Sequence, residues 1–324
     1  MSKLTALALL AGVMLAASTT DNSVSPSGAT ASLPSVRRVV VISVDGLRGD
    51  AMQFMSATSA LRTRALWTDS METVVPSLTV PGHLSMFTGR DVTQIGITTN
   101  TLDATSAFAL RVNAATTMFQ WVHDAGGTSV ALVGKSLVPE SDLETARAFF
   151  GLDQVYSVTS NLDSLRDRAI ALATQPNAPT LLFVHIPTVD YAGHDFGWVR
   201  TDVVTAADGD VLGTAYLQAA RDADGVIAAI SAALQSSVDA GDVALVITAD
   251  HGGGHGDGCI AGMPANREHC TSSLADRTIP FLLVAKGVAG HRLAGRPSIG
   301  QVAASVAKLL GVAQSGGAGA ALHP

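Results

Sequence analysis

Aspartate and histidine residues that could bind metal ions occur in three separated parts of the chain. Asp250 and His251 follow an apolar run and precede three glycines, and Asp45 also ends an apolar run. Asp190 and His194 lie four residues apart. A buried carboxylate or imidazole is costly unless it is paired, and a metal ion is the usual partner of adjacent Asp and His. Each group alone fits a polar strand end or a surface turn equally well, but their repetition favours a metal centre.

A candidate nucleophile, Thr79, lies just before a predicted helix. Pro81 is well placed as the first residue of that helix, because its missing N–H has no partner to lose there. The helix is expected to run to about Thr88, with Gly89 as its C-cap. Amide donors and the positive end of the helix dipole would then face Thr79, which suits a hydroxyl that receives a phosphoryl group. The segment alone favours Thr79 as a simple N-cap.

Strands that alternate with helices must bring these residues together. Apolar, β-branched runs predict strands over residues 39–44, 128–133, 180–186, 243–248 and 278–285. Helices are predicted over residues 50–64, 81–88, 115–125, 140–150, 162–174, 214–237 and 299–310. This alternation predicts an α/β fold, a three-layer α/β/α sandwich around a mostly parallel central sheet. Ligands bind such a sheet at the carboxyl ends of its strands, where Asp45, Asp190 and Asp250 are expected.

Composition limits the domain count and the classes of partner. The chain has 324 residues, of which 47% are hydrophobic and 15% charged, enough for one large α/β domain or, less comfortably, two small ones. The net charge is −7 and no basic cluster is present, which disfavours nucleic acids and anionic membranes as partners. We expect one catalytic domain over residues 37–312 and a flexible tail, rich in Gly and Ala, over 313–324.

The N-terminus has the pattern of an export signal. Lys3 precedes a short apolar run, and the small residues Ala16 and Ser18 suit a cleavage site, which predicts a signal peptide over residues 1–18. The run is too short to span a membrane and has no nearby cysteine, so no stable membrane anchor is expected. A buried N-terminal helix is the alternative. Residues 19–36 are rich in Ser, Thr and Pro and are expected to be disordered. The protein is therefore expected to be periplasmic or secreted.

The chain has two cysteines, Cys259 and Cys270. In an exported protein two nearby cysteines usually form a disulfide, which would stabilise the fold by roughly 3 kcal/mol. Two free buried thiols are the alternative.

Taken in order, these segments resemble the alkaline phosphatase superfamily, and most closely its type I phosphodiesterase, or nucleotide pyrophosphatase/phosphodiesterase, branch. The resemblance covers most of the chain between Val39 and Val288. Four motifs stand in the family's order: Val-Ser-Val-Asp45-Gly-Leu-Arg, Pro-Ser-Leu-Thr79-Val-Pro-Gly-His83, Asp190-Tyr-Ala-Gly-His194 and Thr-Ala-Asp250-His251-Gly. A fifth feature, His269 eleven residues before Pro280, resembles the final metal ligand.

The resemblance implies two zinc ions. One would be held by Asp190, His194 and His269, and the other by Asp45, Asp250 and His251, with Thr79 directed at it. Three imidazoles and three carboxylates independently suit zinc better than magnesium.

Several further residues have expected or alternative roles. Asn100 matches an asparagine that holds a phosphate oxygen, and Lys135 resembles a substrate-contacting lysine of sulfatases and some monoesterases. His255, four residues after His251, is an alternative to His269 as a ligand, although the spacing to the last strand favours His269. His83 and His185 are expected to pack or to support the ligands.

The expected function is that of an exported two-zinc hydrolase of phosphate esters or nucleotides, a phosphodiesterase or nucleotide pyrophosphatase that forms a phospho-threonine on Thr79. A phosphomonoesterase using the same site is the alternative. A metal- or phosphate-binding protein without turnover is a third hypothesis, which the nucleophile disfavours. A formylglycine sulfatase is disfavoured because no Cys-x-Pro-x-Arg segment is present. The oligomeric state stays open.

Overall fold

The computed structural model describes residues 33–101, 116–135, 143–158, 161–202, 209–315 and 318–323. An eight-stranded sheet lies at its centre, in the order β4-β3-β5-β1-β6-β7-β2-β8. The strands are β1 (Arg38–Val44), β2 (Ala65–Glu72), β3 (Ser129–Val133), β4 (Gln154–Ser157), β5 (Leu181–Ile186), β6 (Val243–Thr248), β7 (Thr278–Val284) and β8 (His291–Arg292). All five predicted strands are present, and β2, β4 and β8 are additional.

The middle of the sheet is parallel, as predicted. Strands β3, β5, β1 and β6 run in one direction and consist almost entirely of buried residues, which explains their continuous apolar sequences. Strand β7 runs antiparallel to β6, and β2 runs antiparallel to β7. Because of this reversal, β7 begins at the edge where β6 ends. Residues that precede β7 therefore meet residues that follow β1, β5 and β6.

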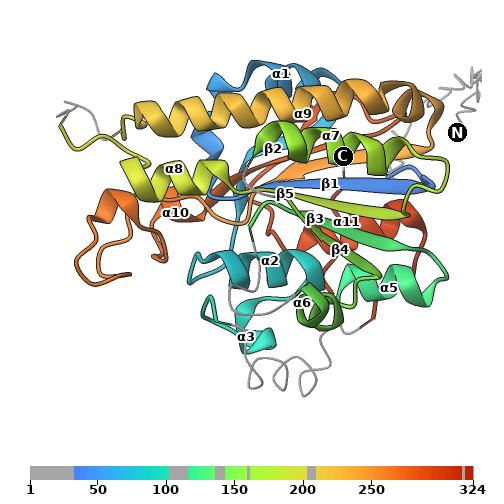
Figure 1. Ribbon diagram of the computed structural model, residues 1–324, viewed down its shortest axis with the longest axis horizontal. Helices are drawn as coiled ribbons and strands as arrows, with labels where there is room; N and C mark the ends of the chain where they lie inside the picture. The colour runs from blue at the N-terminus through green and yellow to red at the C-terminus, as the bar shows by residue number, and fades with distance from the viewer. Residues whose placement is uncertain are drawn as a thin grey trace, which may run out of the picture. The chain divides into compact units, whose positions relative to one another are not determined.

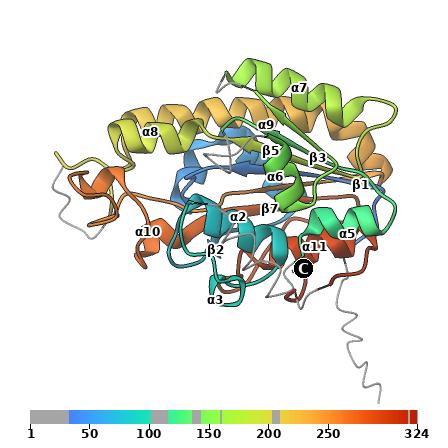
Figure 2. The ribbon, with the colours of Figure 1, turned by 60° about the horizontal axis from the view of Figure 1, so that its bottom comes forward.

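Helices cover both faces of the sheet and confirm the three-layer architecture (Figures 1 and 2). On one face lie α1 (Ser56–Ala60), α7 (Leu162–Thr174) and α9 (Thr214–Ala240), and on the other lie α2 (Thr79–Thr88), α5 (Met118–Asp124) and α11 (Gln301–Leu310). The other helices are short: α3 (Val92–Ile95), α6 (Leu143–Phe150), α8 (Thr188–Phe196), α10 (Leu274–Arg277) and 3₁₀ turns over Gly49–Phe54, Leu61–Arg64 and Ala265–Arg267. The single helix predicted over residues 50–64 is thus three short pieces.

Helix α2 is buried along its whole length and packs closely on the sheet. The Phe87 ring lies 4.8 Å from that of Phe119 and 4.9 Å from that of Phe183, centroid to centroid. At the other end of the helix, a Cβ on Gly82 would lie only 2.5 Å from the carbonyl oxygen of Asp250, so glycine permits the close approach. The packing fixes the start of α2 beside the end of β6.

Two local predictions at this edge were wrong. Helix α2 begins at Thr79 rather than at Pro81, and Leu78 is its N-cap. The simple N-cap role for Thr79 is thereby excluded, while the predicted C-cap, Gly89, is confirmed by its φ of 71°. Residues 190–194, expected in a turn, lie within α8, where an i, i+4 spacing puts two side chains on one face.

The ends of the described chain pack on the domain. Leu33 and Val36, within the segment expected to be disordered, are buried, and the Val36 amide donates to the Leu309 carbonyl at 2.8 Å. In the tail expected to be flexible, Leu322 is buried and its amide donates to the Ser305 hydroxyl at 3.0 Å. The predicted signal peptide lies outside the described residues. Among those residues, no helix is both long and apolar enough to cross a membrane.

Candidate metal centre and nucleophile

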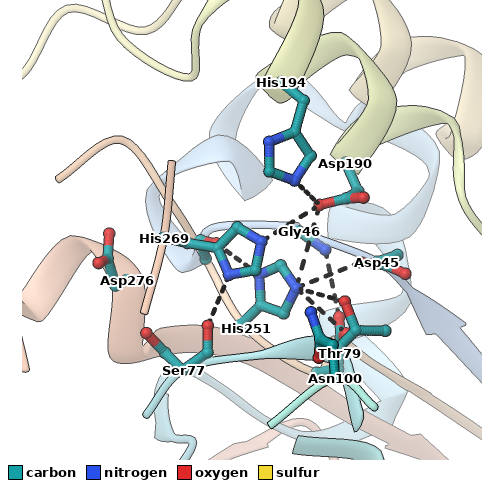
Figure 3. A network of polar contacts seen from close by, with 12 residues as sticks. Asp45, Gly46, Ser77, Thr79, Asn100, Asp190, His194, His251, His269 and Asp276 are labelled. Carbon is teal, nitrogen blue, oxygen red and sulfur yellow. Dashed lines mark hydrogen bonds and ion pairs between the residues drawn. The ribbon is translucent and has the colours of Figure 1, made fainter. Parts of the chain in front are cut away.

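The predicted ligands converge at the carboxyl edge of the sheet (Figure 3). Asp45 follows β1, and Asp250 and His251 follow β6. Asp190 projects from α8, which follows β5, and His269 lies in the loop that leads through α10 to β7. Four separate segments therefore supply one cluster, as expected from the order of parallel strands.

Two groups of side chains have the spacing of metal ligands. Asp45, Asp250 and His251 form one group, and Asp190, His251 and His269 form the other, with the ligand atoms of each group within 4.8 Å of one another. His251 belongs to both groups. His194, predicted as a ligand of the second group, is half-buried with its Nε2 3.4 Å from Asp190 Oδ1. The structure thus brings all six predicted ligands together, with His251 more central than expected.

Each of the three aspartates has one oxygen held by a protein donor. Asp45 Oδ2 lies 2.8 Å from His185 Nε2, Asp190 Oδ2 accepts from Lys135 at 2.6 Å, and Asp250 Oδ1 accepts from the Gly46 amide at 3.2 Å.

The remaining oxygens, Asp45 Oδ1, Asp190 Oδ1 and Asp250 Oδ2, are buried and have no hydrogen-bond partner among the described residues. Imidazole nitrogens of the same cluster approach them, at 3.3–3.4 Å. Unpaired buried carboxylate oxygens are strongly destabilising, and a bound cation removes that cost. The donor set therefore fits a metal centre.

The imidazoles are oriented in a way that suits metal binding. Their Nδ1 atoms lie 2.7 Å from the Gly252 carbonyl for His251, 2.6 Å from the Ser77 carbonyl for His269, and 2.8 Å from the Arg267 carbonyl for His194. A carbonyl only accepts, so each Nδ1 carries the proton. Each Nε2 then faces the carboxylates, and in the neutral ring it has a lone pair that can bind a metal ion. Histidine ligands in metalloproteins are commonly held in this way.

The metal-free cluster balances its charges with protons. Burial lowers the pKa of His251, but Asp250 and Asp45 outweigh it and raise that pKa to about 10. Burial and His251 lower the pKa of His269 to about 3. Burial and the neighbouring Asp45 raise the pKa of Asp250 well above its usual value. A metal ion would replace these protons as the compensating charge.

Lys135, predicted to contact substrate, pairs with two of the aspartates. Its Nζ lies 2.7 Å from Asp45 Oδ2 and 2.6 Å from Asp190 Oδ2. Burial lowers the pKa of Lys135, but the two carboxylates outweigh it and raise that pKa above its usual value. Its positive charge is therefore engaged within the cluster.

Thr79 is placed beside the shared ligand of the two groups. Its Oγ1 lies 3.2 Å from His251 Nε2, and its carbonyl lies 2.8 Å from His83 Nδ1. The amide of Val80 donates to Asn100 Oδ1 at 3.0 Å, which fixes the orientation of the Asn100 amide group and leaves its NH₂ as the outer donor. The start of α2 thus presents a hydroxyl and, through Asn100, a donor to the same space (Figure 3).

His255, the alternative to His269, lies outside both ligand groups. It is exposed, and its Nε2 lies 2.9 Å from Asp210 Oδ2. Cys259 and Cys270 form a disulfide with a Cα–Cα distance of 6.0 Å, which confirms the predicted pairing. Because Cys270 directly follows His269, this bond fixes the loop next to a predicted ligand.

Some residues that build the site were not identified from the sequence. Ser77 accepts from His269, and the Gly46 amide holds Asp250. The buried carboxylate of Asp276 binds backbone amides beside the ligand loops. Ser77 and Gly46 act through backbone groups, which side-chain patterns do not reveal. Asp276 precedes β7 instead of following a strand, so the pattern of acidic residues after apolar runs did not mark it.

The whole domain matches one family model. This model, type I phosphodiesterase / nucleotide pyrophosphatase, covers residues 39–309. The chain belongs to that family. Membership accounts for the order of the motifs around Asp45, Thr79 and Asp250. The family is one of hydrolases. A search of curated proteins found no match.

Solved structures with the same fold come from the alkaline phosphatase superfamily and related enzymes. Ps i-CgsB, in complex with k-i-k-neocarrahexaose, has a TM-score of 0.66 and 14% identity, covering 88% of this chain and 75% of its own. Murine ectonucleotide pyrophosphatase / phosphodiesterase 5, as an inactive threonine-to-alanine variant with AMP, has a TM-score of 0.63 and 14% identity, covering 86% and 96%. An alkaline phosphatase superfamily protein from Vibrio parahaemolyticus has a TM-score of 0.57 and 12% identity, covering 89% and 70%.

Proposed function

We propose that this family member is an exported two-zinc phosphodiesterase or nucleotide pyrophosphatase that acts through a phospho-threonine on Thr79. One observation carries the proposal: the Thr79 hydroxyl lies 3.2 Å from Nε2 of His251, the residue common to both candidate ligand groups. A protein that only binds metal has no use for a hydroxyl at this position. The substrate class is a small phosphodiester or nucleotide.

The zinc ions would be held by the three aspartates, whose free oxygens are buried, and by Nε2 of the three histidines. When bound, they would supply Lewis-acid activation of the hydroxyl and neutralisation of phosphate charge. The mixed imidazole and carboxylate set favours zinc over magnesium.

The reaction would proceed in two displacements at phosphorus. In the first, Oγ1 of Thr79 forms a bond to phosphorus and the bond to the departing alcohol oxygen breaks, while the hydroxyl proton of Thr79 passes through solvent to that oxygen. In the second, a water oxygen attacks phosphorus and the bond to Oγ1 breaks. One proton of the water passes to Oγ1, which regenerates the Thr79 hydroxyl and releases a phosphate monoester. The NH₂ group of Asn100 and the dipole of α2 would stabilise the non-bridging oxygens in both steps.

The pairing of Lys135 favours a diester over a monoester. A monoester carries one more negative charge and gains from an additional cation near the phosphate. Lys135 is the expected source of that cation, but its ammonium group is held by Asp45 and Asp190. Murine ectonucleotide pyrophosphatase / phosphodiesterase 5, with its AMP complex and its inactive threonine variant, supports a nucleotide substrate and a threonine nucleophile. A phosphomonoesterase is the second candidate, and it requires Lys135 to leave these carboxylates.

Export is supported by two features of the chain. The disulfide between Cys259 and Cys270 suits an oxidising compartment, and the N-terminal residues have the pattern of a signal peptide. We infer a periplasmic or secreted protein with one catalytic domain over residues 37–312.

Parallel assays of bis-p-nitrophenyl phosphate and p-nitrophenyl phosphate, with metal content measured on the same sample, test the proposal. We expect two zinc ions per chain, faster turnover of the diester, loss of activity with a chelator and recovery with zinc. Faster turnover of the monoester would favour the second candidate. Metal binding without turnover of either substrate would overturn both enzymatic proposals.

A further inference from the structure

A buried carboxylate outside the ligand groups joins the two loops that carry His251 and His269. Asp276, in α10, is fully buried. Its Oδ2 accepts from the Thr271 hydroxyl at 2.6 Å and from the Thr271 amide at 3.1 Å, just beyond His269. Its Oδ1 accepts from the His255 amide at 3.2 Å, four residues after His251 in the loop that follows β6.

The backbone of the same residue reaches still closer to His251. The Gly252 amide donates to the Asp276 carbonyl at 2.8 Å. The close approach requires glycine at this position, because a Cβ on Gly252 would lie 2.1 Å from the carbonyl oxygen of Ala275. One residue thus holds the chain directly after His251 and, through its side chain, the chain directly after His269.

The two imidazoles that these loops carry are packed face to face. Their ring centroids lie 3.7 Å apart with an angle of 14° between the planes. Both belong to the ligand group that includes Asp190, so a small shift of either loop changes the distances between the ligand atoms. Asp276 itself belongs to neither ligand group, and Figure 3 draws it on the far side of His269 from Asp45.

We propose that Asp276 is a positioning residue that sets the separation of His251 and His269 and thereby the affinity of the centre for its metal. This inference rests on the proposed metal-dependent function. The carboxylate form is required because donors from two different loops face its two oxygens. An asparagine would turn an NH₂ group toward one of these sets of donors, and that loop would move away.

The chain contains a matched control in Asp224. This residue of α9 is also buried, and its carboxylate accepts from the Ala57 amide at 2.9 Å, the Thr58 amide at 2.7 Å and the Thr58 hydroxyl at 2.6 Å. Asp224 therefore has nearly the same chemistry, but its partners are in α1 and not in the ligand loops. Asp224→Asn tests what the loss of such a carboxylate does to the fold alone.

The experiment compares zinc affinity, by chelator competition, and thermal unfolding of the metal-free protein for wild type, Asp276→Asn and Asp224→Asn. We expect both variants to lower the unfolding temperature. Only Asp276→Asn should weaken zinc binding, by about 10- to 100-fold, as is typical for residues that support metal ligands. Thr271→Val removes one donor to Asp276 and keeps the carboxylate, so it should weaken zinc binding by a smaller factor. If Asp276→Asn does not fold, the zinc affinity of Thr271→Val tests the inference instead.

Three results would overturn the inference: unchanged zinc affinity in Asp276→Asn, equal losses of affinity in Asp276→Asn and Asp224→Asn, or, if Asp276→Asn fails to fold, unchanged affinity in Thr271→Val. A wild-type protein that binds no zinc would instead overturn the proposed function, and this inference with it. A wild-type protein that binds zinc normally but hydrolyses neither substrate would contradict the proposed catalytic function and would leave the proposed role of Asp276 unaffected.

Discussion

The imidazole rings of His251 and His269 stack with their centroids 3.7 Å apart, and the two rings have opposite pKa shifts. The pKa of His251 is raised to about 10 by Asp250 and Asp45 against the effect of burial, and that of His269 is lowered to about 3 by burial and by His251. Two charged rings in buried contact would repel each other strongly. The metal-free protein therefore keeps one stacked ring protonated and the other neutral near pH 7.

Zinc binding should release protons. His251 must lose its proton before Nε2 can bind a metal, and its metal-free pKa of about 10 means that it carries this proton at pH 7.5. Zinc affinity should rise about tenfold per pH unit for each proton released. Calorimetry in two buffers of different ionisation enthalpy should show at least one proton released per chain at pH 7.5. A binding enthalpy that is the same in both buffers would contradict the assignment.

The same pKa shift has a consequence for the stability of the metal-free protein. A group whose pKa is raised on folding stabilises the native state while it is protonated in that state. The contribution of His251 is therefore complete below its unfolded pKa of about 6.5 and is lost as the pH rises through about 10. Zinc should remove this alkaline decline, because the bound form no longer depends on the proton.

Replacement of the nucleophile should separate catalysis from metal binding. Thr79→Ala removes the hydroxyl that lies 3.2 Å from His251 Nε2 and should lower kcat for the diester by about 10³-fold or more. Thr79→Ser keeps a hydroxyl and should retain part of the activity. The control is Thr88→Ala at the other end of α2, where the hydroxyl donates to the Leu84 carbonyl and accepts from the Arg90 amide, away from the candidate ligands.

Zinc affinity should stay within a few-fold of wild type in all these variants. Full turnover by Thr79→Ala would exclude the phospho-threonine mechanism. Turnover lost together with zinc binding would instead assign Thr79 a role in holding the metal.

The sequence predicted the centre of the fold better than its edges. Strands β1, β5 and β6 are buried on both faces, so their apolar runs are unbroken and easily recognised. Strand β2 carries polar residues on a partly exposed face and contains a bulge between Thr68 and Met71, which breaks the alternation. Strands β4 and β8 are too short to give a periodic signal.

The predicted ligands come together because each follows or precedes a strand of one sheet. The sequence could not show that β7 runs antiparallel to β6, although this reversal brings His269 to the centre. It also could not show the supporting contacts. Ser77 meets His269, and Asp276 meets the His255 amide, only after the chain has folded. These hydrogen bonds also use backbone atoms, which every residue has and which no sequence pattern marks.

Two histidines offered by the sequence as alternatives should differ sharply when mutated. His269→Ala removes a buried side chain of one ligand group and should weaken zinc binding on the order of 100-fold. His255→Ala removes an exposed ring that pairs with Asp210 and should leave zinc binding unchanged. Chelator competition on both variants measures the difference. A larger loss in His255→Ala would mean that the loop rearranges when metal binds and that His255 is the ligand.

Lys135 offers the sharpest test of the preference for diesters. Lys135→Met leaves Asp45 and Asp190 without their shared cation. The free energy of unfolding of the metal-free protein, measured with urea, should therefore fall by roughly 3 kcal/mol. Bound zinc should restore much of this stability. Lys286→Met is the control, because that exposed lysine donates to the Ala240 carbonyl and, within the described part of the chain, pairs with no carboxylate.

The two roles of Lys135 also differ in their effect on catalysis. If the ammonium group serves Asp45 and Asp190, Lys135→Met should change the turnover of bis-p-nitrophenyl phosphate and of p-nitrophenyl phosphate by similar factors. If it contacts the substrate phosphate, the monoester reaction should suffer far more, since the doubly charged group loses the larger interaction. A selective loss of monoester turnover, without destabilisation of the metal-free protein, would therefore favour the phosphomonoesterase.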